Sequence, residues 1–415
     1  MRVLQINSVY GVGSTGRIVE DIEDVLTRSG HECFVAYGMG RGTDDRRHHR
    51  MQSRNAVRLS VAQTRLFGRH GFYNRGATKR LLSWIADVDP DVVHLHNVHG
   101  HYINLELLFG YLASAKKPVV WTLHDCWPFT GHCAYADYLG CSKWVEGCHR
   151  CEQRHEYPGS WFLDRSTRNY RDKKALFNSI ETLTIVTPSG WLAGLVGQSF
   201  LGGYPVRVVP NGINLHVFKP TVSSFRCEHG LEDRFVILGV APGFSERKGF
   251  KYFVDLAAAL TEDETIVLVG ASGRQLASLP SSVIGVPRTD SASQLAGVYS
   301  AADVLLNPTL EDNFPTVNIE ALACGTPVIT FNTGGSAEAV DSRTGVVVER
   351  GSLNGLREAI RQVELLGRGH FQRACLERAG RLYDRDHTYG VYVELLEEAF
   401  RASGAAHPPD GTAIA

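Results

Sequence analysis

Short apolar runs alternate along the chain with longer stretches in which apolar residues recur at helical spacing. Buried parallel strands give the first pattern, and amphipathic helices give the second. The runs that predict strands are Arg2–Ile6, His31–Tyr37, Asp91–His96, Pro118–Leu123, Leu183–Thr187, Phe235–Ala241, Thr265–Gly270, Val283–Val286, Ala302–Leu306 and Val328–Phe331. The alternation therefore predicts an α/β protein with doubly wound parallel sheets.

A glycine-rich turn follows the first predicted strand, and an apolar helical pattern follows the turn. Gly11, Gly13 and Gly16 let a backbone approach a ligand closely, and the helix start after them favours phosphate. The spacing matches G-x-G-x-x-G, but Asn7–Tyr10 separates it from the predicted strand. A dinucleotide site also expects an acidic residue at the end of the second strand, and none stands at Tyr37–Gly40. These two departures disfavour a NAD site without excluding one.

The most informative motif lies in Ala302–Phe331, where a strand, a loop, a helix and a strand follow one another. Asn307–Pro315 is loop by composition, and Val317–Cys324 has helical spacing. Open α/β sheets bind ligands at the carboxyl ends of their strands, and a helix start offers unpaired N–H groups to an anion. Asp312 and Glu320 lie in this loop and on this helix. We therefore expect both carboxylates to point toward one binding crevice.

Composition limits the function classes. A chain of 415 residues should hold more than one domain, and 43% hydrophobic with 21% charged residues is ordinary for a soluble protein. The formal net charge of −1 gives no global attraction to nucleic acid, although Arg46–Arg50 is locally basic. We see neither a secretory signal nor a run of about 18 apolar residues. The nine cysteines are an odd number, which fits a reduced, cytoplasmic protein.

The acidic loop and its helix resemble the E-x7-E motif of the retaining nucleotide-sugar glycosyltransferases of family 4, which have the GT-B fold. Asp312 is the first acid if Phe314 takes the aromatic position two residues later, and Glu311 is the competing alignment. In that family the loop backbone contacts the donor sugar and diphosphate, and the second acid holds the ribose hydroxyls. The resemblance implies donor contacts by Asp312, Asn313, Phe314, Pro315 and Thr316, and ribose contacts by Glu320.

Other segments resemble one branch of that family more closely. HNVHGHYINLELLFGYL, VWTLHDCWPFTGHCAYADY and YPGSWFLDRSTRNYRDKK, all between Asn97 and Phe177, are similar to transferases that build bacterial exopolysaccharide, including those of colanic-acid type. The resemblance covers nearly the whole chain. It implies two Rossmann-like domains that face each other across a cleft.

The resemblance also implies a division of labour. Residues 1–210 would form the acceptor-side domain, with a cysteine-rich insertion at 126–165, and Gly13 would face the donor phosphates. Residues 211–385 would bind the nucleotide sugar. Residues 386–403 would form a terminal helix that crosses back to the first domain.

Two cations precede the first helix of the second half, in GFSERKG. Arg247 and Lys248 combine positive charge with a helix start, which is typical of a phosphate site. In the family an arginine stands earlier in this loop, but Gly243 occupies that place here, so Arg247 substitutes for it. Lys248 and Arg247 would stabilise the charge that develops on the leaving diphosphate, and the chemistry would require no cofactor.

Histidines gather where the predicted first sheet ends. His124 and Asp125 follow Pro118–Leu123, a favoured place for catalytic groups, and Asp125 would fix the tautomer of a catalytic His124. A second group consists of His94, His96, His99 and His101. This group leaves a zinc hydrolase open as an alternative, although its spacing matches no known zinc motif.

Four cysteines fall within one turn-rich stretch, at Cys133, Cys141, Cys148 and Cys151. Four thiolates are the ligand set of a closed structural zinc site, and Cys148-x-x-Cys151 is a usual half of such a site. Free buried thiols or two disulfides are the alternatives, of which a cytoplasmic location disfavours disulfides.

The sequence therefore predicts a hexosyl transfer from a nucleoside-diphosphate sugar to a hydroxyl acceptor, in polysaccharide or glycoconjugate biosynthesis. The acceptor would be a lipid-linked glycan or a small molecule, with peripheral membrane contact and no nucleic acid partner. A nucleotide-sugar epimerase of the same fold and a noncatalytic sugar-nucleotide-binding protein are the alternatives.

Overall fold

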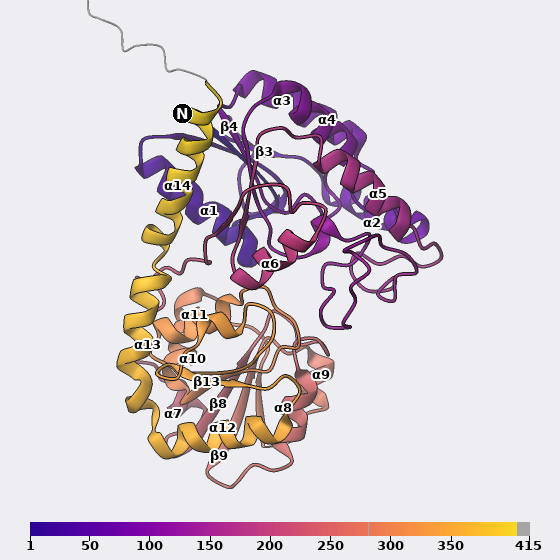
Figure 1. Ribbon diagram of the computed structural model, residues 1–415. Coiled ribbons are helices and arrows are strands. Elements are labelled where there is room, and N and C mark those ends of the chain that lie inside the picture. Colours follow the sequence, from indigo (N-terminus) through magenta and orange to yellow (C-terminus); the bar gives the residue numbers. More distant parts are fainter. Residues whose placement is uncertain (281, 405–415) are drawn as a thin grey trace, which may run out of the picture.

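The computed structural model describes residues 1–280 and 282–404, which fold into two α/β domains stacked end to end (Figure 1). The strands of the first domain are β1 (Arg2–Tyr10), β2 (Glu32–Gly40), β3 (His48–Arg50), β4 (Val92–Leu95), β5 (Val119–Thr122), β6 (Leu183–Thr187) and β7 (Val206–Val208). Its helices are α1 (Gly13–Arg28), α2 (Arg54–Phe67), α3 (Arg75–Val88), α4 (Leu105–Ala115), η1 (Trp127–Phe129), α5 (Ser166–Phe177) and α6 (Gly190–Gln198).

The second domain follows after β7. Its strands are β8 (Phe235–Val240), β9 (Glu264–Val269), β10 (Val283–Val286), β11 (Val304–Asn307), β12 (Val328–Phe331) and β13 (Gly345–Val348). Its helices are α7 (Phe225–His229), α8 (Phe250–Ala257), α9 (Gly273–Ala277), α10 (Ala292–Ala301), α11 (Thr316–Ala323), η2 (Ala337–Ala339), α12 (Leu353–Leu366) and α13 (Arg368–Leu382). The helix α14 (Arg385–Ala402) then returns to the first domain.

Both sheets are parallel and doubly wound, which confirms the predicted fold class. The strand orders are β3-β2-β1-β4-β5-β6-β7 and β10-β9-β8-β11-β12-β13. Each order reverses beside the first strand of its domain, between β1 and β4 and between β8 and β11. Strands β4, β5, β11 and β12 are buried at every position, as expected when helices cover both faces of a parallel sheet.

The first strand is longer than the sequence predicts. β1 pairs with β2 in parallel register as far as Tyr10 and Gly40, whereas the apolar pattern ends at Ile6. The buried amide of Asn7 explains the difference, because it donates to the carbonyl oxygen of Val9 (2.7 Å) and is satisfied inside the fold. The glycine turn therefore follows its strand directly. The argument against a dinucleotide site that relied on a gap at Asn7–Tyr10 was wrong.

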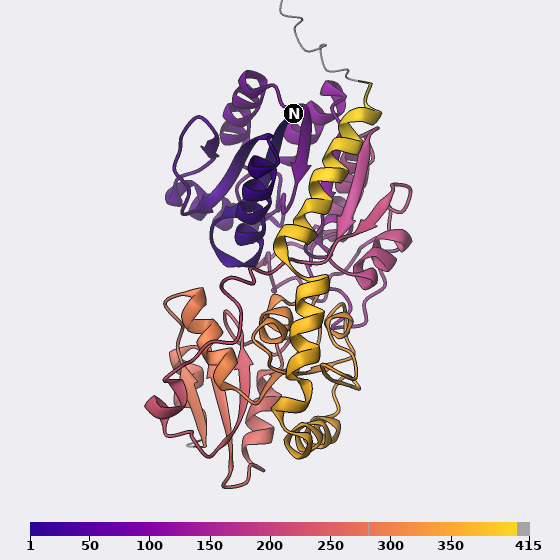
Figure 2. The same ribbon diagram turned by 90° about the vertical axis from the view of Figure 1, so that its left-hand side faces the viewer.

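The C-terminal helices connect the two domains (Figure 2). α13 packs on α11 in the second domain, and α14 lies along α1 in the first. α14 begins at Arg385, one residue before the predicted bound, and the Asp384 side chain caps it. Tyr389 anchors this helix: its hydroxyl accepts from the N–H of Gly212 (3.0 Å) in the connection between the domains. Within the described residues, no helix is both long and apolar enough to cross a membrane.

The buried Tyr389 hydroxyl yields a stability prediction. Tyr389→Phe leaves the N–H of Gly212 without this acceptor, and an unsatisfied buried donor costs about 1–3 kcal/mol. We expect a lower melting temperature by differential scanning calorimetry, with Tyr73→Phe, a partly exposed tyrosine, as the control. An unchanged melting temperature for Tyr389→Phe would contradict this role.

Candidate active site between the two domains

Two loops meet at the switch point of the second sheet, where the strand order reverses. One loop follows β8 and the other follows β11, and the N–H of Leu310 donates to the carbonyl oxygen of Arg247 (2.7 Å) across them. The approach is so close that a Cβ on Gly249 would lie 2.1 Å from the carbonyl oxygen of Pro308. Gly249 also has φ of +74°, so glycine is required here for both space and conformation.

The charged side chains of these loops pair with each other. Lys248 Nζ donates to Asp312 Oδ2, and Arg247 Nη1 donates to the carbonyl oxygen of Glu311. The carboxylate of Glu311 points elsewhere, into the first domain. The structure thus brings the predicted cations onto the acidic loop, and it places Asp312 rather than Glu311 beside the lysine.

Glu320 lies on α11 and is almost fully buried. Its carboxylate accepts a hydrogen bond from the hydroxyl of Tyr299 (2.8 Å), and burial raises its pKa. The positive charge of Arg17, which comes from α1 of the first domain, opposes this shift. Neither Tyr299 nor Arg17 carried a motif that sequence reasoning could have used to place it near Glu320.

The loop residues between Asp312 and α11 are fixed by their side chains. Asn313 Nδ2 donates to the carbonyl oxygen of His124 in the first domain, and the buried ring of Phe314 lies 5.7 Å from that of Tyr383. Pro315 is the N-cap residue of α11 and Thr316 its first residue. The side chains of Asn313 and Phe314 are therefore engaged within the protein, and the N–H groups that favour an anion are those of the first turn of α11, which begins at Thr316.

His124 lies at the end of β5, but its partner differs from the predicted one. His124 Nε2 and His96 Nδ1 are 3.1 Å apart, and their rings stack. Burial lowers the pKa of His124 to about 4, so the imidazole is neutral at pH 7. The expectation that Asp125 fixes the tautomer of His124 was wrong, because Asp125 faces His99.

Asp125 instead belongs to a second buried network. Its Oδ2 lies 2.8 Å from His99 Nε2, and His99 Nδ1 lies 2.8 Å from the hydroxyl of Tyr157. His94 takes a separate partner, the hydroxyl of Thr122 (2.9 Å). Among the described residues, no three His, Cys, Asp or Glu side chains form a group that could hold a metal ion. The histidine cluster is accordingly a hydrogen-bonded network.

Gly13 opens α1 at the carboxyl end of the first sheet, beside that sheet's switch point. It has φ of +66°, and no heavy atom lies within 4 Å of the position its Cβ would take. Gly16, one turn later, packs against the backbone of Tyr10 and Gly11. The turn is exposed at Gly13 and tightly packed at Gly16, which suits a loop that a ligand approaches.

Both domains of the chain match known protein families. Residues 15–217 match the family described as Glycosyltransferase Family 4, and residues 233–364 match Glycosyl transferases group 1. A putative colanic acid biosynthesis glycosyl transferase of Escherichia coli K12, WcaC, is 25% identical over 376 residues, covering 84% of this chain and 87% of that protein. The chain is a glycosyltransferase, with a match to a glycosyltransferase family in each of its two domains.

Solved structures show the same fold. Sucrose-phosphate synthase from Thermosynechococcus elongatus superposes with a TM-score of 0.69 at 19% identity, covering 97% of this chain and all of that one. Anabaena HepE in complex with UDP gives 0.66 at 16% identity, covering 96% and 100%. The two doubly wound domains are therefore the GT-B fold. None of these relatives is an epimerase by name.

The four cysteines of this glycosyltransferase lie in its insertion, and none forms a disulfide. The thiol of Cys133 hydrogen-bonds to Cys151, which lowers the pKa of Cys151. Cys148 Sγ accepts from the N–H of Gly131 (3.1 Å), and Cys141 is partly exposed. The thiols of Cys133 and Cys151 are thus in contact, but the four cysteines are not arranged as the four ligands of a zinc ion. The zinc site stays a prediction.

Metal analysis tests that prediction. A zinc site would require the four thiols to come closer together than they lie here; it would give one zinc per chain in protein purified without chelator, and a lower melting temperature after chelation, because structural zinc binds the folded state. Cys133→Ser should lose the metal, whereas Cys227→Ser, which changes an exposed thiol outside the insertion, should keep it. Metal-free protein with four titratable thiols in the insertion would exclude a zinc site.

Proposed function

We propose that this glycosyltransferase moves a hexosyl group from a nucleoside-diphosphate sugar to a hydroxyl acceptor, with retention at the anomeric carbon. The observation that carries the proposal is the pairing of Lys248 with Asp312 at the switch point, beside Arg247 and the start of α11. This is where open α/β sheets bind ligands, and it combines two cations with helix-start amides. Anabaena HepE, which shares this fold and was solved in complex with UDP, supports a nucleotide donor.

The chemistry follows from these charges. The bond between the anomeric carbon and the diphosphate oxygen breaks, the acceptor oxygen bonds to the same carbon, and its proton passes to the diphosphate. Lys248 and Arg247 stabilise the negative charge that develops on the diphosphate. The ribose would lie near Glu320, and the neutral His124 would face the sugar from the first domain. Closure of the two domains would exclude water and limit donor hydrolysis.

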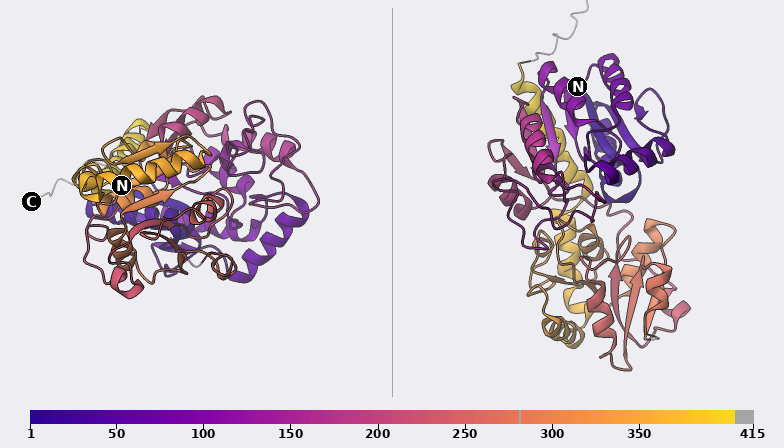
Figure 3. Two further views of the ribbon diagram at one scale, coloured as in Figure 1. Left: turned by 90° about the horizontal axis from the view of Figure 1, so that it is seen from below. Right: turned by 90° about the vertical axis from the view of Figure 1, so that its right-hand side faces the viewer.

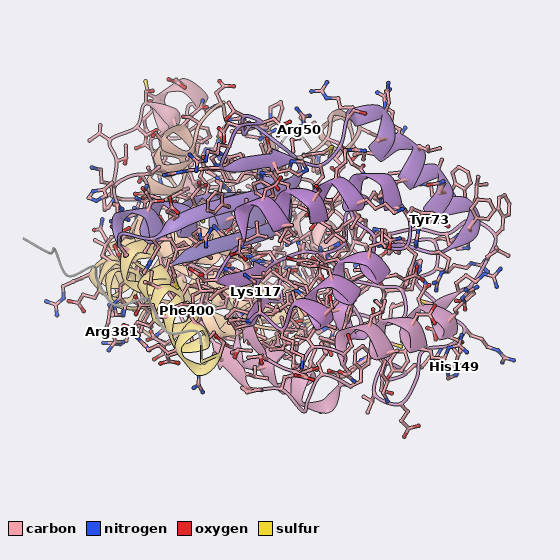
Figure 4. The ribbon with its side chains drawn as sticks, turned by 90° about the horizontal axis from the view of Figure 1, so that it is seen from above. Arg50, Tyr73, Lys117, His149, Arg381 and Phe400 are labelled. Atoms are coloured by element: carbon pink, nitrogen blue, oxygen red, sulfur yellow. The ribbon has the colours of Figure 1, made fainter. Side chains whose placement is uncertain are left out.

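The acceptor side of the molecule supports a lipid-linked glycan at a cytoplasmic membrane surface. From Asp45 to Asp87 the sequence contains no other acidic residue. The cations in this interval are Arg46, Arg47, Arg50, Arg54, Arg58, Arg65, Arg69, Arg75, Lys79 and Arg80. Figure 4 views the molecule from the first-domain end and labels two residues of this interval, Arg50 and Tyr73.

Helix α2, within this basic interval, buries polar side chains and exposes apolar ones. Ser60 and Thr64 are buried, whereas Leu59 and Phe67 are 61% and 53% exposed. The neighbouring Trp161, whose N–H donates to the carbonyl oxygen of Arg65 (2.7 Å), is also exposed. Exposed apolar side chains among cations suit the surface of an anionic bilayer.

The donor proposal is tested by binding and product analysis. A thermal-shift screen of UDP, GDP, dTDP and ADP sugars should identify one stabilising base. With that donor, Lys248→Ala should lower kcat by about 10²–10³, whereas Lys251→Ala, an exposed lysine on α8 paired with Asp255, should not. NMR of the product should show the donor's anomeric configuration. Full activity of Lys248→Ala would refute the site, and an inverted product would refute retention.

The lipid proposal has its own test. We expect the protein to sediment with phosphatidylglycerol-containing vesicles and not with neutral ones, with binding that weakens as salt rises. Leu59→Ser with Phe67→Ser should reduce sedimentation, whereas Leu365→Ser with Leu366→Ser, exposed on α12, should leave it unchanged. Equal sedimentation of both double variants would show that α2 is not the docking face.

A further inference from the structure

The insertion at 126–165 belongs to the first domain but reaches the second (Figures 1 and 3). Its residue Tyr135 lies under the predicted phosphate cation, with the guanidinium carbon of Arg247 3.7 Å from the ring centroid. A cation over an aromatic face at this distance is attracted by the ring and held in a defined orientation. Arg247 is therefore fixed by a residue from the opposite domain.

Glu311 makes the second contact. Its carboxylate is 0% exposed and accepts three backbone N–H groups of the insertion. Oε1 accepts from Ala136 (3.0 Å) and Asp137 (3.3 Å), and Oε2 accepts from Tyr138 (2.6 Å). A buried carboxylate is costly unless it is hydrogen-bonded, so these donors are what allows Glu311 to lie inside the interface.

Arg350 closes the same contact from the other side. Its guanidinium donates to the carboxylate of Asp137 (3.0 Å) and to the carbonyl oxygen of Tyr138 (2.8 Å). Glu311 is the centre of the arrangement, because its side chain holds the insertion while its carbonyl oxygen accepts from Arg247. The next residue along the chain, Asp312, is the partner of Lys248.

We propose that residues 135–138 of the insertion complete the donor site, and that Tyr135 and Glu311 are positioning residues for Arg247 and for the loop that carries Asp312. The inference rests on the proposed donor site. It accounts for the glycine at position 243, where the resembled family has an arginine: the remaining Arg247 is held in place by a ring from the insertion.

Substitutions at Tyr135 test this role. Tyr135→Phe keeps the aromatic face and should bind the donor nucleotide like the wild type. Tyr135→Leu removes the face and should weaken binding of the nucleoside diphosphate by about 2- to 30-fold. Binding of the corresponding nucleoside, which lacks phosphate, should not change. Equal weakening of both ligands, or of neither, in a protein with wild-type melting temperature would overturn the inference.

Hydrogen exchange of the ligand-free protein tests the Glu311 contact without any donor. Glu311→Ala should increase exchange of the amides of Ala136, Asp137 and Tyr138, because it removes their acceptor. Glu146→Gln, an exposed position on the same insertion, is the control. Unchanged exchange in Glu311→Ala would overturn the contact, whereas a failure of donor binding alone would count against the proposed function.

The same amides should respond to pH. Burial raises the pKa of Glu311 to about 7, against the lowering effect of the N–H groups of Tyr138 and Asp137. The charge of Asp137 raises this pKa further, and that of Arg247 lowers it. The nearby Cys126 and Tyr135 are themselves kept neutral by burial, which raises their pKa values. Because the docked carboxyl binds its proton more tightly than a free one, docking is favoured at low pH and weakens as pH rises toward about 7.

We therefore expect protection of the three amides, corrected for intrinsic exchange, to be about tenfold greater at pH 5.5 than at pH 7.5. Glu311→Gln, which is uncharged at both values, should show equal protection at the two, and Glu146→Gln should behave like the wild type. A pH dependence that persists in Glu311→Gln would assign it to another group and overturn this part of the inference.

Discussion

The ion pair between Lys248 and Asp312 joins the two loops on which the site is built. It requires the backbone at Gly249 to pass Pro308 at a distance that no side chain allows, and it places α11 so that its first turn faces the same point. Opposite charges on adjacent switch-point loops hold each other in position, so the cation that would meet a diphosphate is already oriented. The remaining contacts of the site serve to keep these two loops in register.

Contact between the domains relies on side chains that bind backbone groups. Asn313 donates to the carbonyl oxygen of His124, and Glu338 accepts from the N–H groups of Gly190 and Trp191. Each such bond depends on where the partner's backbone lies and not on which side chain it bears. These bonds therefore form only when the loops of the first domain lie at defined positions relative to the second. Only a narrow range of domain orientations satisfies all of them together.

The histidines of the first domain show how burial changes the meaning of a motif. His94 and His124 have pKa values lowered to about 3 and about 4, and both pair with neighbouring polar groups. A neutral imidazole can accept or donate a hydrogen bond without adding charge to the interface. The buried His94 therefore serves the packing of the first sheet, and neither histidine adds a charge that would compete with the cations of the second domain.

The sequence alone determined the fold class and the strand, loop and helix of the acidic motif, because apolar periodicity and glycine placement are local properties. It also placed Arg247, Lys248 and Asp312 at strand ends, where parallel sheets collect ligands. It did not determine the hydrogen-bond partners of His124, Asp125 or Glu311. Neighbouring residues of one loop can face different domains, and which of them do so depends on how the two sheets are stacked. The insertion's contact with Arg247 is likewise decided only by tertiary structure, because Tyr135 and Arg247 are brought together by domain packing and share no pattern along the chain.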